Sequence, residues 1–589
     1  LAETRAKERC LSLAARAEAL PKELTAGALT EAQERDLRAL VADYRKLMVD
    51  ENPAVNFDEL LFIRRKGPSG LTANWQSNSK APKRGYDNAL FRLNVRDPKA
   101  APKEVFRPAG GTFIGDVDLH WNADKALFSS IGEKNGAWHV FELDLATGKA
   151  RQVTRDNDPD INHYDACYLP DGRIILTCTA LNYAVPCVNG DTPVANLYRV
   201  NADGSGLEAL TSDQEHAWCP MVMPDGRVLY QRWEYADLPH SNSRMLFTCN
   251  PDGTNQRAFY GSNSFWPNAL FYARTIPGSN SRFVGIVTGH HGVARVGECV
   301  LFDATLGREN ADGAIQRLPG YGKKVEPIVR DQLVNASWPK SLHPYPLDGD
   351  NFLLARQRAP GAPWELVLTD RFDNAIVLRR DPGAYLFEPV PLRKEKMPPA
   401  IPDRVVPGAK DATLYVADIY QGPGLRGIPR GTVKSLRLYT YTYGFRGHGG
   451  LYGSIGVDGP WDMRRVLGTV PVREDGSALF SVPANTPIAI QPLDAEGKSL
   501  QVMRSWVTAR PGEFLSCVGC HEPIAAAAAP APVAHGKPEA ITPWRGPVRN
   551  YTFEREVQPV LDRRCVGCHN EKSGLDLRSG RPVKGWKTA

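Results

Sequence analysis

The chain contains 589 residues, more than a single hydrophobic core accommodates, so we expect several domains. Hydrophobic residues make up 42% of the sequence and charged residues 23%, which excludes a mostly disordered chain, and the 52 glycines and 47 prolines favour a β fold rich in turns. A formal net charge of only +6 without a long basic run argues against nucleic-acid binding, and no apolar stretch reaches the roughly 20 residues of a transmembrane helix.

Residues 1–52 are predicted to form an N-terminal helical arm. Thr30 followed by Gln33 is a capping-box pattern, which satisfies the first backbone donors of a helix. Apolar residues then recur at helical spacing and form one stripe, which suits a helix packed against a neighbour: Leu37, Leu40, Val41, Tyr44 and Leu47.

Residues 53–385 carry a repeat of about 50 residues. A short strand-like segment ending in Asp or Asn occurs six times, and the terminal residues are Asn94, Asp144, Asn201, Asn250, Asp303 and Asp370. Asp-Gly turn signals, clearest at 171–172 and 225–226, fall between these segments, so each unit contains two hairpins. Four strands per repeat is the pattern of a propeller blade, and the sequence therefore predicts a six-bladed β-propeller in a mainly β chain.

The innermost strand of each predicted blade lines the central channel, and we assign that place to the strand that enters each Asp-Gly turn. Counting six residues back from the turn aspartate gives Asp118, Asp165, Cys219 and, less regularly, Leu342 beside His343. Carboxylates and a thiol are ligands for zinc and can hold a substrate by charge, so Asp165 and Cys219 are candidate catalytic and zinc-binding residues. The alternative is that the aspartates cap strand ends and that the cysteine is merely buried.

Histidines in two predicted loops complete the candidate catalytic set. His240 follows a proline, and His290 and His291 stand between Gly289 and Gly292. Adjacent histidines beside glycine suit a site loop, whereas a single exposed histidine is usually without function.

A second β domain is predicted after the propeller. Residues 386–410 are rich in Pro, Lys and Arg and read as a linker. Strand-like segments return over residues 411–523, including 413–416, 436–441 and 478–482. A group attached at the end of this domain would have a fixed orientation.

The pentapeptide Cys-Val-Gly-Cys-His occurs twice, at 517–521 and at 565–569. C-x-x-C-H is the attachment signature of c-type haem, in which two thiols form thioethers and the adjoining imidazole ligates the iron. A four-cysteine zinc ribbon is the alternative, but it does not need a histidine after both pairs. We therefore expect two haem c groups, held by Cys517, Cys520, His521, Cys565, Cys568 and His569, with His521 and His569 as iron ligands.

The haem motifs also predict a compartment and a domain boundary. Covalent haem attachment takes place outside the cytoplasm in bacteria, which predicts a periplasmic protein. Residues 524–550 are rich in Ala and Pro and read as a linker to a second haem module over residues 551–589, so we expect the second haem on the more mobile module.

Five segments carry a resemblance to a known family: 232–235 (Arg-Trp-Glu-Tyr), 289–292 (Gly-His-His-Gly), 476–487, 503–506 (Met-Arg-Ser-Trp) and 511–513 (Pro-Gly-Glu). They resemble the alpha subunit of hydrazine synthase and its relatives, over residues 57 to 575. The resemblance implies a six-bladed propeller, a β domain and two c-type haems in an enzyme that joins nitric oxide and ammonia through hydroxylamine. It further implies that the haem at Cys517 and Cys520 is reactive and faces the propeller, while the haem at Cys565 and Cys568 relays electrons.

The sequence departs from that family at one point. In the family, a Tyr shortly after the first haem motif ligates the iron and the motif histidine is diverted to zinc. Here Glu522, Pro523 and a run of Ala follow His521, with no Tyr. Ordinary ligation by His521 is therefore expected, and the reaction need not be hydrazine synthesis.

The sequence thus predicts a periplasmic dihaem oxidoreductase that acts on a small, nitrogenous molecule and works with a redox partner or additional subunits. Catalysis at iron requires an open coordination position with polar groups nearby to donate protons. The alternative is an electron-transfer or scaffold subunit whose propeller docks proteins, because the fold does not decide between these readings. A dihaem peroxidase is disfavoured, since the two motifs begin only 48 residues apart, which leaves little room for two cytochrome domains.

Overall fold

The computed structural model describes residues 12–13, 15–16, 30–185, 188, 190–235, 244–262, 264–446, 463–520, 536–544, 546 and 552–580. The predicted mainly β class is confirmed, since antiparallel strands dominate the described residues and helices are few. None of the helices in these ranges combines the length and the hydropathy needed to span a bilayer.

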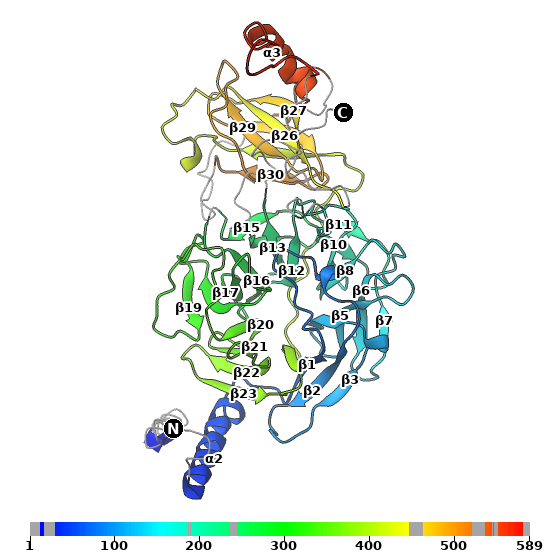
Figure 1. Cartoon of the computed structure of the whole chain (residues 1–589), viewed down its shortest axis with the longest axis vertical. Helices are drawn as coiled ribbons and strands as arrows, with labels where there is room; N and C mark the ends of the chain where they lie inside the picture. Colours follow the sequence, from blue (N-terminus) through cyan, green and yellow to red (C-terminus); the bar gives the residue numbers. More distant parts are fainter. Residues whose placement is uncertain are drawn as a thin grey trace.

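The N-terminal arm contains helix α2 (Glu31–Arg45), followed by one π-helical turn, η1 (Lys46–Asp50). The predicted capping box is present, because the Thr30 hydroxyl accepts a hydrogen bond from Gln33 N and the Gln33 side chain accepts one from Thr30 N. Helix α2 extends away from the rest of the chain (Figure 1), and burial begins at Met48 and Val49, which join a core cluster of the body.

Residues 59–391 form six antiparallel groups of four strands. The first is β24 (Tyr385–Pro391), β1 (Glu59–Lys66), β2 (Asp87–Asn94) and β3 (Lys103–Phe106). The second is β4 (Ile114–Leu119), β5 (Lys125–Ile131), β6 (Trp138–Asp144) and β7 (Ala150–Gln152). The third is β8 (His163–Tyr168), β9 (Ile174–Cys178), β10 (Asn196–Val200) and β11 (Glu208–Ala209).

The remaining three groups follow the same order. The fourth is β12 (Ala217–Val222), β13 (Val228–Trp233), β14 (Arg244–Cys249) and β15 (Arg257–Tyr260). The fifth is β16 (Ala269–Thr275), β17 (Arg282–Thr288), β18 (Glu298–Asp303) and β19 (Ala314–Leu318), joined to the fourth through one parallel pair between Arg244 and Ala269. The sixth is β20 (Lys340–Pro346), β21 (Asn351–Gln357), β22 (Glu365–Asp370) and β23 (Ala375–Arg379).

The six groups lie around a common centre (Figure 1), and we call them together the six-sheet body. Strand β24 pairs with β1, which joins the last part of the body to the first. The predicted segments that end in Asp or Asn are the third strand of each group: β2, β6, β10, β14, β18 and β22. Apolar clusters fill the space between neighbouring groups, as with Val140 against Leu176 and Ile175 against Tyr230.

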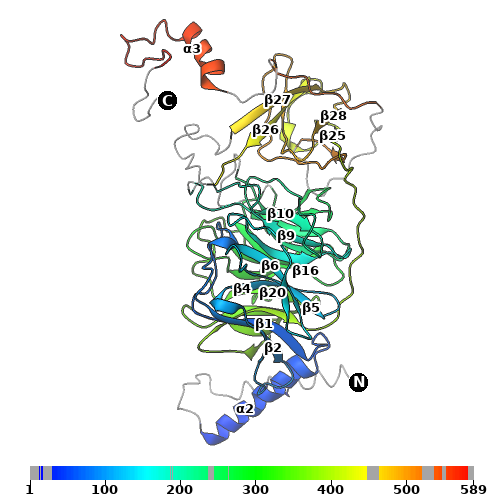
Figure 2. The ribbon, with the colours of Figure 1, turned by 90° about the vertical axis from the view of Figure 1, so that its right-hand side faces the viewer.

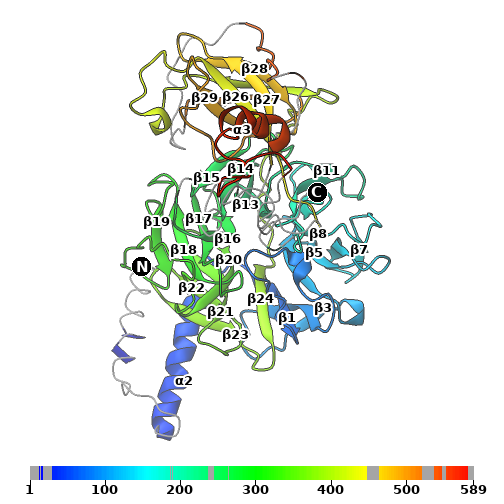
Figure 3. The same ribbon diagram turned by 45° about the horizontal axis from the view of Figure 1, so that its top comes forward.

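The second β domain contains two three-stranded sheets around one apolar cluster that includes Leu414, Leu436 and Phe480. One sheet is β28 (Ala478–Pro483), β25 (Asp411–Val416) and β30 (Phe514–Cys517), and the other is β27 (Met463–Pro471), β26 (Ser435–Thr442) and β29 (Ala489–Leu493). Strand β30 runs parallel to β25 and ends at the first haem motif. Figure 2 shows this domain beyond one edge of the six-sheet body, and Figure 3 shows it at the opposite end from helix α2.

Part of the segment predicted as an Ala/Pro-rich linker contributes to the β domain. Glu539 forms an isolated bridge with Phe480, and Thr542 forms one with Thr469. Farther along the chain, η6 (Phe553–Val557) and α3 (Gln558–Arg564) lead directly into Cys565. The segment of described residues 536–544 therefore packs on the domain that precedes it.

Candidate functional site

A cavity of about 80 Å³ lies where the six groups meet, and residues of β4, β8, β12, β16, β20 and β24 line it. These are the first strands of the six groups in the observed order. The sequence-based assignment of β8 and β12 as channel-lining strands agrees with this arrangement.

One residue of each lining strand adopts a left-handed backbone conformation at a β-bulge. These residues have φ between 49° and 55° and are Asp116, Asp165, Cys219, Tyr272, His343 and Glu388. Residues other than glycine rarely adopt such angles, and a bulge re-aims the side chain at that position. The six side chains therefore line one cavity at equivalent positions.

Only part of this ring was found from the sequence. Asp165, Cys219 and His343 occupy the ring. Asp118 also lines the cavity, two residues after the ring position of its strand, and Leu342 lies one residue before His343. The ring position is thus Asp116 on its strand, not Asp118, and it is His343, not its neighbour Leu342. Tyr272 and Glu388 were not among the predicted residues.

Two carboxylates of the ring bind the backbone of the next group. Asp165 Oδ2 accepts a hydrogen bond of 2.8 Å from Cys219 N. Glu388 accepts two, of 3.1 Å from Asp116 N and 2.7 Å from Val117 N. Asp165 and Glu388 thus satisfy backbone donors at a neighbouring bulge, which is the role given by the alternative interpretation of the sequence.

Burial controls the protonation of the ring. It raises the pKa of Asp165 to about 7 and that of Glu388 to about 7, with the nearby Asp116 carboxylate adding to both shifts. Burial also raises the pKa of the Cys219 thiol well above its usual range, and lowers the pKa of His343 to about 3. Near neutral pH the cavity therefore holds a neutral thiol, a neutral imidazole and carboxyl groups that exchange protons.

The segment between β1 and β2 reaches this cavity. Asn78, in the 3₁₀ turn η2 (Asn78–Lys80), donates from Nδ2 to Asp116 Oδ2 over 3.2 Å. The Arg295 guanidinium holds the same segment by binding Asn78 Oδ1 and Gln76 O, and lies over the Trp218 ring at 4.5 Å. Asn78 thus links Arg295 to the ring residue Asp116. The cavity itself is lined by another arginine, Arg274.

The predicted zinc ligands supply an incomplete site. Within the described ranges, no three His, Cys, Asp or Glu side chains are placed together to hold a metal ion. Asp165 and Cys219 are adjacent, but a zinc site needs about four ligands. His240, the remaining histidine of the candidate set, and His521, the expected iron ligand, lie outside the described residues.

The paired histidines lie away from the cavity. His290 Nδ1 is 2.6 Å from Arg244 Nη2, and His291 Nδ1 is 2.8 Å from the Asp331 carboxylate at the surface. Neither histidine lines the cavity that holds Asp165 and Cys219. The structure therefore brings two of the five candidate catalytic residues together, does not bring His290 and His291 to them, and leaves His240 undescribed.

The first haem motif is fixed to the β domain through its backbone. Cys517 O accepts from Ala417 N at 2.9 Å, Val518 O from Asp418 N at 3.0 Å, and Cys520 O from Gly424 N at 3.2 Å. Gly519 packs so closely that a Cβ atom there would press on Gln421 O and lie 2.7 Å from Asp418 O. These contacts fix the backbone at both cysteines, so a group attached to them would have a defined orientation.

The second motif lies in a turn that directly follows helix α3. His569 N donates to Cys565 O at 2.8 Å and Cys568 N to Cys565 O at 3.1 Å, so one helical turn gathers the two cysteines and the histidine. Apolar side chains on the same short module are unusually exposed: Phe553 (53%), Val560 (50%) and Leu575 (56%). Such a concentration of apolar surface on a module of this size fits a haem that covers it.

Two segments that carried the family resemblance contact each other. Trp506 Nε1 donates to Asp213 Oδ1 over 2.9 Å, and the Ser505 hydroxyl donates to Glu234 Oε1 over 2.7 Å. The guanidinium of Arg232 lies over the Trp506 ring. Residues 503–506 of the β domain therefore pack against residues 232–234 of the six-sheet body.

Comparisons with known proteins support this resemblance. Residues 431–522 match the family model described as the hydrazine synthase alpha subunit middle domain. The hydrazine synthase subunit alpha of Kuenenia stuttgartiensis is 24% identical over 174 residues, and this match spans 20% of the chain and only 22% of that protein. The solved structure of Kuenenia stuttgartiensis hydrazine synthase has the same fold, with a TM-score of 0.69, 16% identity and coverage of 90% of this chain and 83% of that one. The chain is therefore similar to the hydrazine synthase alpha subunit, in sequence over residues 431–522 and in fold over most of its length.

Proposed function

We propose that the chain is a periplasmic dihaem c-type redox protein, and that it is an oxidoreductase acting on a small, nitrogenous molecule. The observation that carries this proposal is the repeated Cys-Val-Gly-Cys-His motif, at 517–521 and 565–569. The first copy lies within the segment that matches the hydrazine synthase family model. The likeness to a hydrazine synthase subunit supports a role in nitrogen redox chemistry.

We interpret the six-sheet body as a six-bladed β-propeller. Six four-stranded antiparallel groups, one central cavity lined by the first strand of each, and the pairing of β24 with β1 all support it. On this interpretation the chain comprises a helical arm, the propeller, a second β domain and a C-terminal haem module.

In this proposal Cys517 and Cys520 hold the first haem and His521 ligates its iron. A c-type haem supplies a redox-active iron that can bind a small ligand when one coordination position is open. The loop around Gly519 fixes the attachment thiols, and β30 joins them to the β domain. We propose that this haem faces the propeller and is the substrate site.

Carboxyl groups of the propeller cavity would donate protons to the reaction or accept protons from it. With pKa values of about 7, Asp165 and Glu388 can gain or lose a proton under physiological conditions. Asp165 and Cys219 would also supply two ligands to a zinc ion. His290 and His291 remain candidate proton carriers in a loop outside the cavity.

Cys565, Cys568 and His569 would hold a second haem that serves as an electron relay. Its module is small and its cysteines are partly exposed, which suits approach of another protein. The partner would be a redox protein or additional subunits, as the name of the related subunit alpha suggests.

A second candidate function is electron transfer without catalysis, with the propeller as a docking platform. The observation that favours it is the engagement of Asp165 and Glu388 with backbone donors of neighbouring groups, which gives these acids a structural role. A catalytic haem needs an open coordination position, whereas a relay haem has both axial positions filled.

Counting covalent haems tests the shared part of both candidates. Intact mass spectrometry of the protein, expressed with haem-attachment machinery, should give two haems per chain. The variants Cys520→Ser and Cys568→Ser should each lose one of them. A wild-type protein that carries no covalent haem, and binds zinc through its cysteines, would contradict the proposal.

A further inference from the structure

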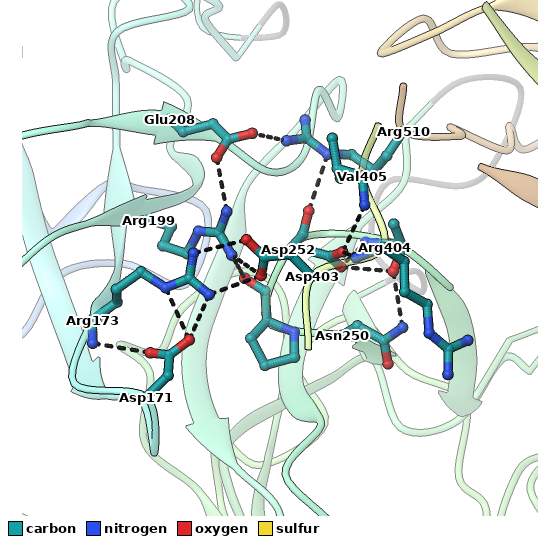
Figure 4. Close-up of polar contacts among 12 residues, drawn as sticks. Asp171, Arg173, Arg199, Glu208, Asn250, Asp252, Asp403, Arg404, Val405 and Arg510 are labelled. Carbon is teal, nitrogen blue, oxygen red and sulfur yellow. Dashed lines mark hydrogen bonds and ion pairs between the residues drawn. The ribbon is translucent and has the colours of Figure 1, made fainter. Parts of the chain in front are cut away.

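A chain of ion pairs crosses from the six-sheet body to the β domain (Figure 4). The segment between β24 and β25, residues 392–410, connects these two parts and is called the connector. It contributes Asp403, whose carboxylate accepts hydrogen bonds from Arg173 Nη1 at 2.9 Å and from Arg199 Nη1 at 2.8 Å. Arg199 also pairs with Glu208 over 3.0 Å, and Glu208 pairs with Arg510 of the β domain. Cations and anions thus alternate along a path that links three parts of the chain.

Arg510 forms hydrogen bonds to both the six-sheet body and the β domain. It is 3% exposed, and all three of its guanidinium nitrogens donate hydrogen bonds. Nε binds Asp252 O at 3.1 Å, Nη1 binds Ala209 O at 2.7 Å and Asn485 Oδ1 at 2.8 Å, and Nη2 binds Glu208. Three of these acceptors belong to the body and one to the β domain, so a single planar group ties the two together.

The neighbours of Arg510 are held in the same way. Glu513 accepts from Arg510 N at 2.7 Å and from Asn255 N, in the body, at 2.6 Å. Asp252 accepts from the connector at Arg404 N over 2.5 Å and Val405 N over 3.2 Å. The connector, the turn at 252–255 and residues 510–513 therefore form one hydrogen-bonded unit.

This unit leads without interruption into the first haem motif. Strand β30 begins at Phe514, directly after Glu513, and ends at Cys517. Pairing with β25 fixes Cys517 inside the β domain, with Val416 opposite it. The contacts of Arg510 fix the β domain to the body, so they set the place of Cys517 relative to the body.

We propose that Arg510 is a positioning residue for the first haem. It acts by holding residues 510–517 on the third and fourth groups of the body, so that the haem keeps one orientation toward the body. This inference rests on the proposed function, because it needs a haem at Cys517 and Cys520. Arg510 itself touches neither substrate nor the attachment cysteines among the contacts described.

The test compares three variants of the full-length, haem-loaded protein. Arg510→Met removes the charge and every hydrogen bond of the side chain while keeping much of its volume. Arg510→Lys keeps the charge and its pairing with Glu208 but loses the planar set of donors. Arg317→Met is the matched control, because Arg317 pairs with Glu298 within the fifth group. Each variant is measured well below its thermal unfolding midpoint by haem count, redox titration and low-temperature EPR.

We expect Arg510→Met to retain two covalent haems. Its first haem should show shifted EPR g values and a shifted midpoint potential, with the second haem unchanged. Arg510→Lys should recover part of the wild-type spectrum, and Arg317→Met should match the wild type. A folded Arg510→Met protein with two haems and wild-type signals for both would overturn the positioning role alone. A wild-type protein without haem at Cys517 and Cys520 would overturn the proposed function and this inference together.

Discussion

The guanidinium of Arg232 lies over the indole ring of Trp506, with 4.3 Å between the guanidinium carbon and the ring centroid. Arg232 Nη2 also donates to Trp506 O over 3.2 Å and pairs with Glu234 Oε1 over 2.9 Å. Both side chains are almost fully buried. One arginine of the six-sheet body therefore pairs with a buried carboxylate and also packs against the ring of a β-domain tryptophan.

Replacing Arg232 should destabilise this junction strongly. In Arg232→Met, the carboxylates of Asp213 and Glu234 lose their buried cation, and removal of one partner of a buried ion pair typically costs about 3–5 kcal/mol. Arg317→Met removes a more exposed pair and should cost about 1 kcal/mol or less. Urea unfolding followed by tryptophan fluorescence measures both values. Equal losses for the two variants would contradict the assigned importance of the junction.

The two haem motifs offer a matched pair of glycine substitutions. In Gly519→Ala the new methyl group would collide with backbone oxygens of Gln421 and Asp418, so the first attachment loop must shift. Gly567, at the same place in the second motif, has open space around it. We expect Gly519→Ala to lower haem occupancy at the first site and Gly567→Ala to leave occupancy at the second site near that of the wild type. Peptide mass mapping of the haem peptides gives both occupancies, and equal loss at the two sites would contradict the structure.

The cavity carboxylates predict a specific pH dependence of stability. Burial and the nearby Asp116 raise the pKa of Glu388 from its ordinary value to about 7 in the folded protein, so the folded state binds an extra proton between about pH 4.5 and 7. Stability contributed by this proton is present at low pH and is lost as the pH rises toward 7, by up to about 1.4 kcal/mol per pH unit.

The variant Glu388→Gln cannot ionise, so its stability relative to the wild type should increase as the pH rises from 5 to 7.5. The quantity to compare is the difference in the free energy of unfolding between the variant and the wild type. Buried His139 and His163, with pKa values of about 4 and 3, make the stability of both proteins rise with pH, and this contribution cancels in the difference. Chemical denaturation at several pH values measures this difference. A difference that stays constant over this range would show that Glu388 is ionised throughout.

The sequence predicted the cavity-lining position in the third and fourth groups, where the Asp-Gly turn has the expected register. Asp165 and Cys219 each precede an Asp-Gly turn by six residues, and that spacing is observed. In the second group, Asn122 and Ala123 take the place of Asp-Gly, with Ala123 in the left-handed conformation at φ 57°, so counting from Asp124 selected Asp118 in place of Asp116. After β16 the turn is longer, as Ile276 N bonds to Arg282 O, and Tyr272 had no signal.

Contacts between segments that are far apart in the sequence could not be predicted from local sequence patterns. Glu388 enters the ring because β24 pairs with β1, more than 300 residues away along the chain. The contact of Arg232 with Trp506 and the contacts of Arg510 with Glu208 likewise join distant segments. The motifs 232–235 and 503–506 were visible as family signatures, but their role as two sides of one junction needed the fold.

The most direct test of the central claim is the EPR spectrum of the oxidised protein before and after addition of nitric oxide. We predict a high-spin ferric component from the first haem that disappears when nitric oxide binds, while the second haem keeps a low-spin signal. Cys520→Ser should lose the responsive component. Two low-spin haems that do not respond to nitric oxide would contradict a catalytic first haem and favour the electron-transfer role.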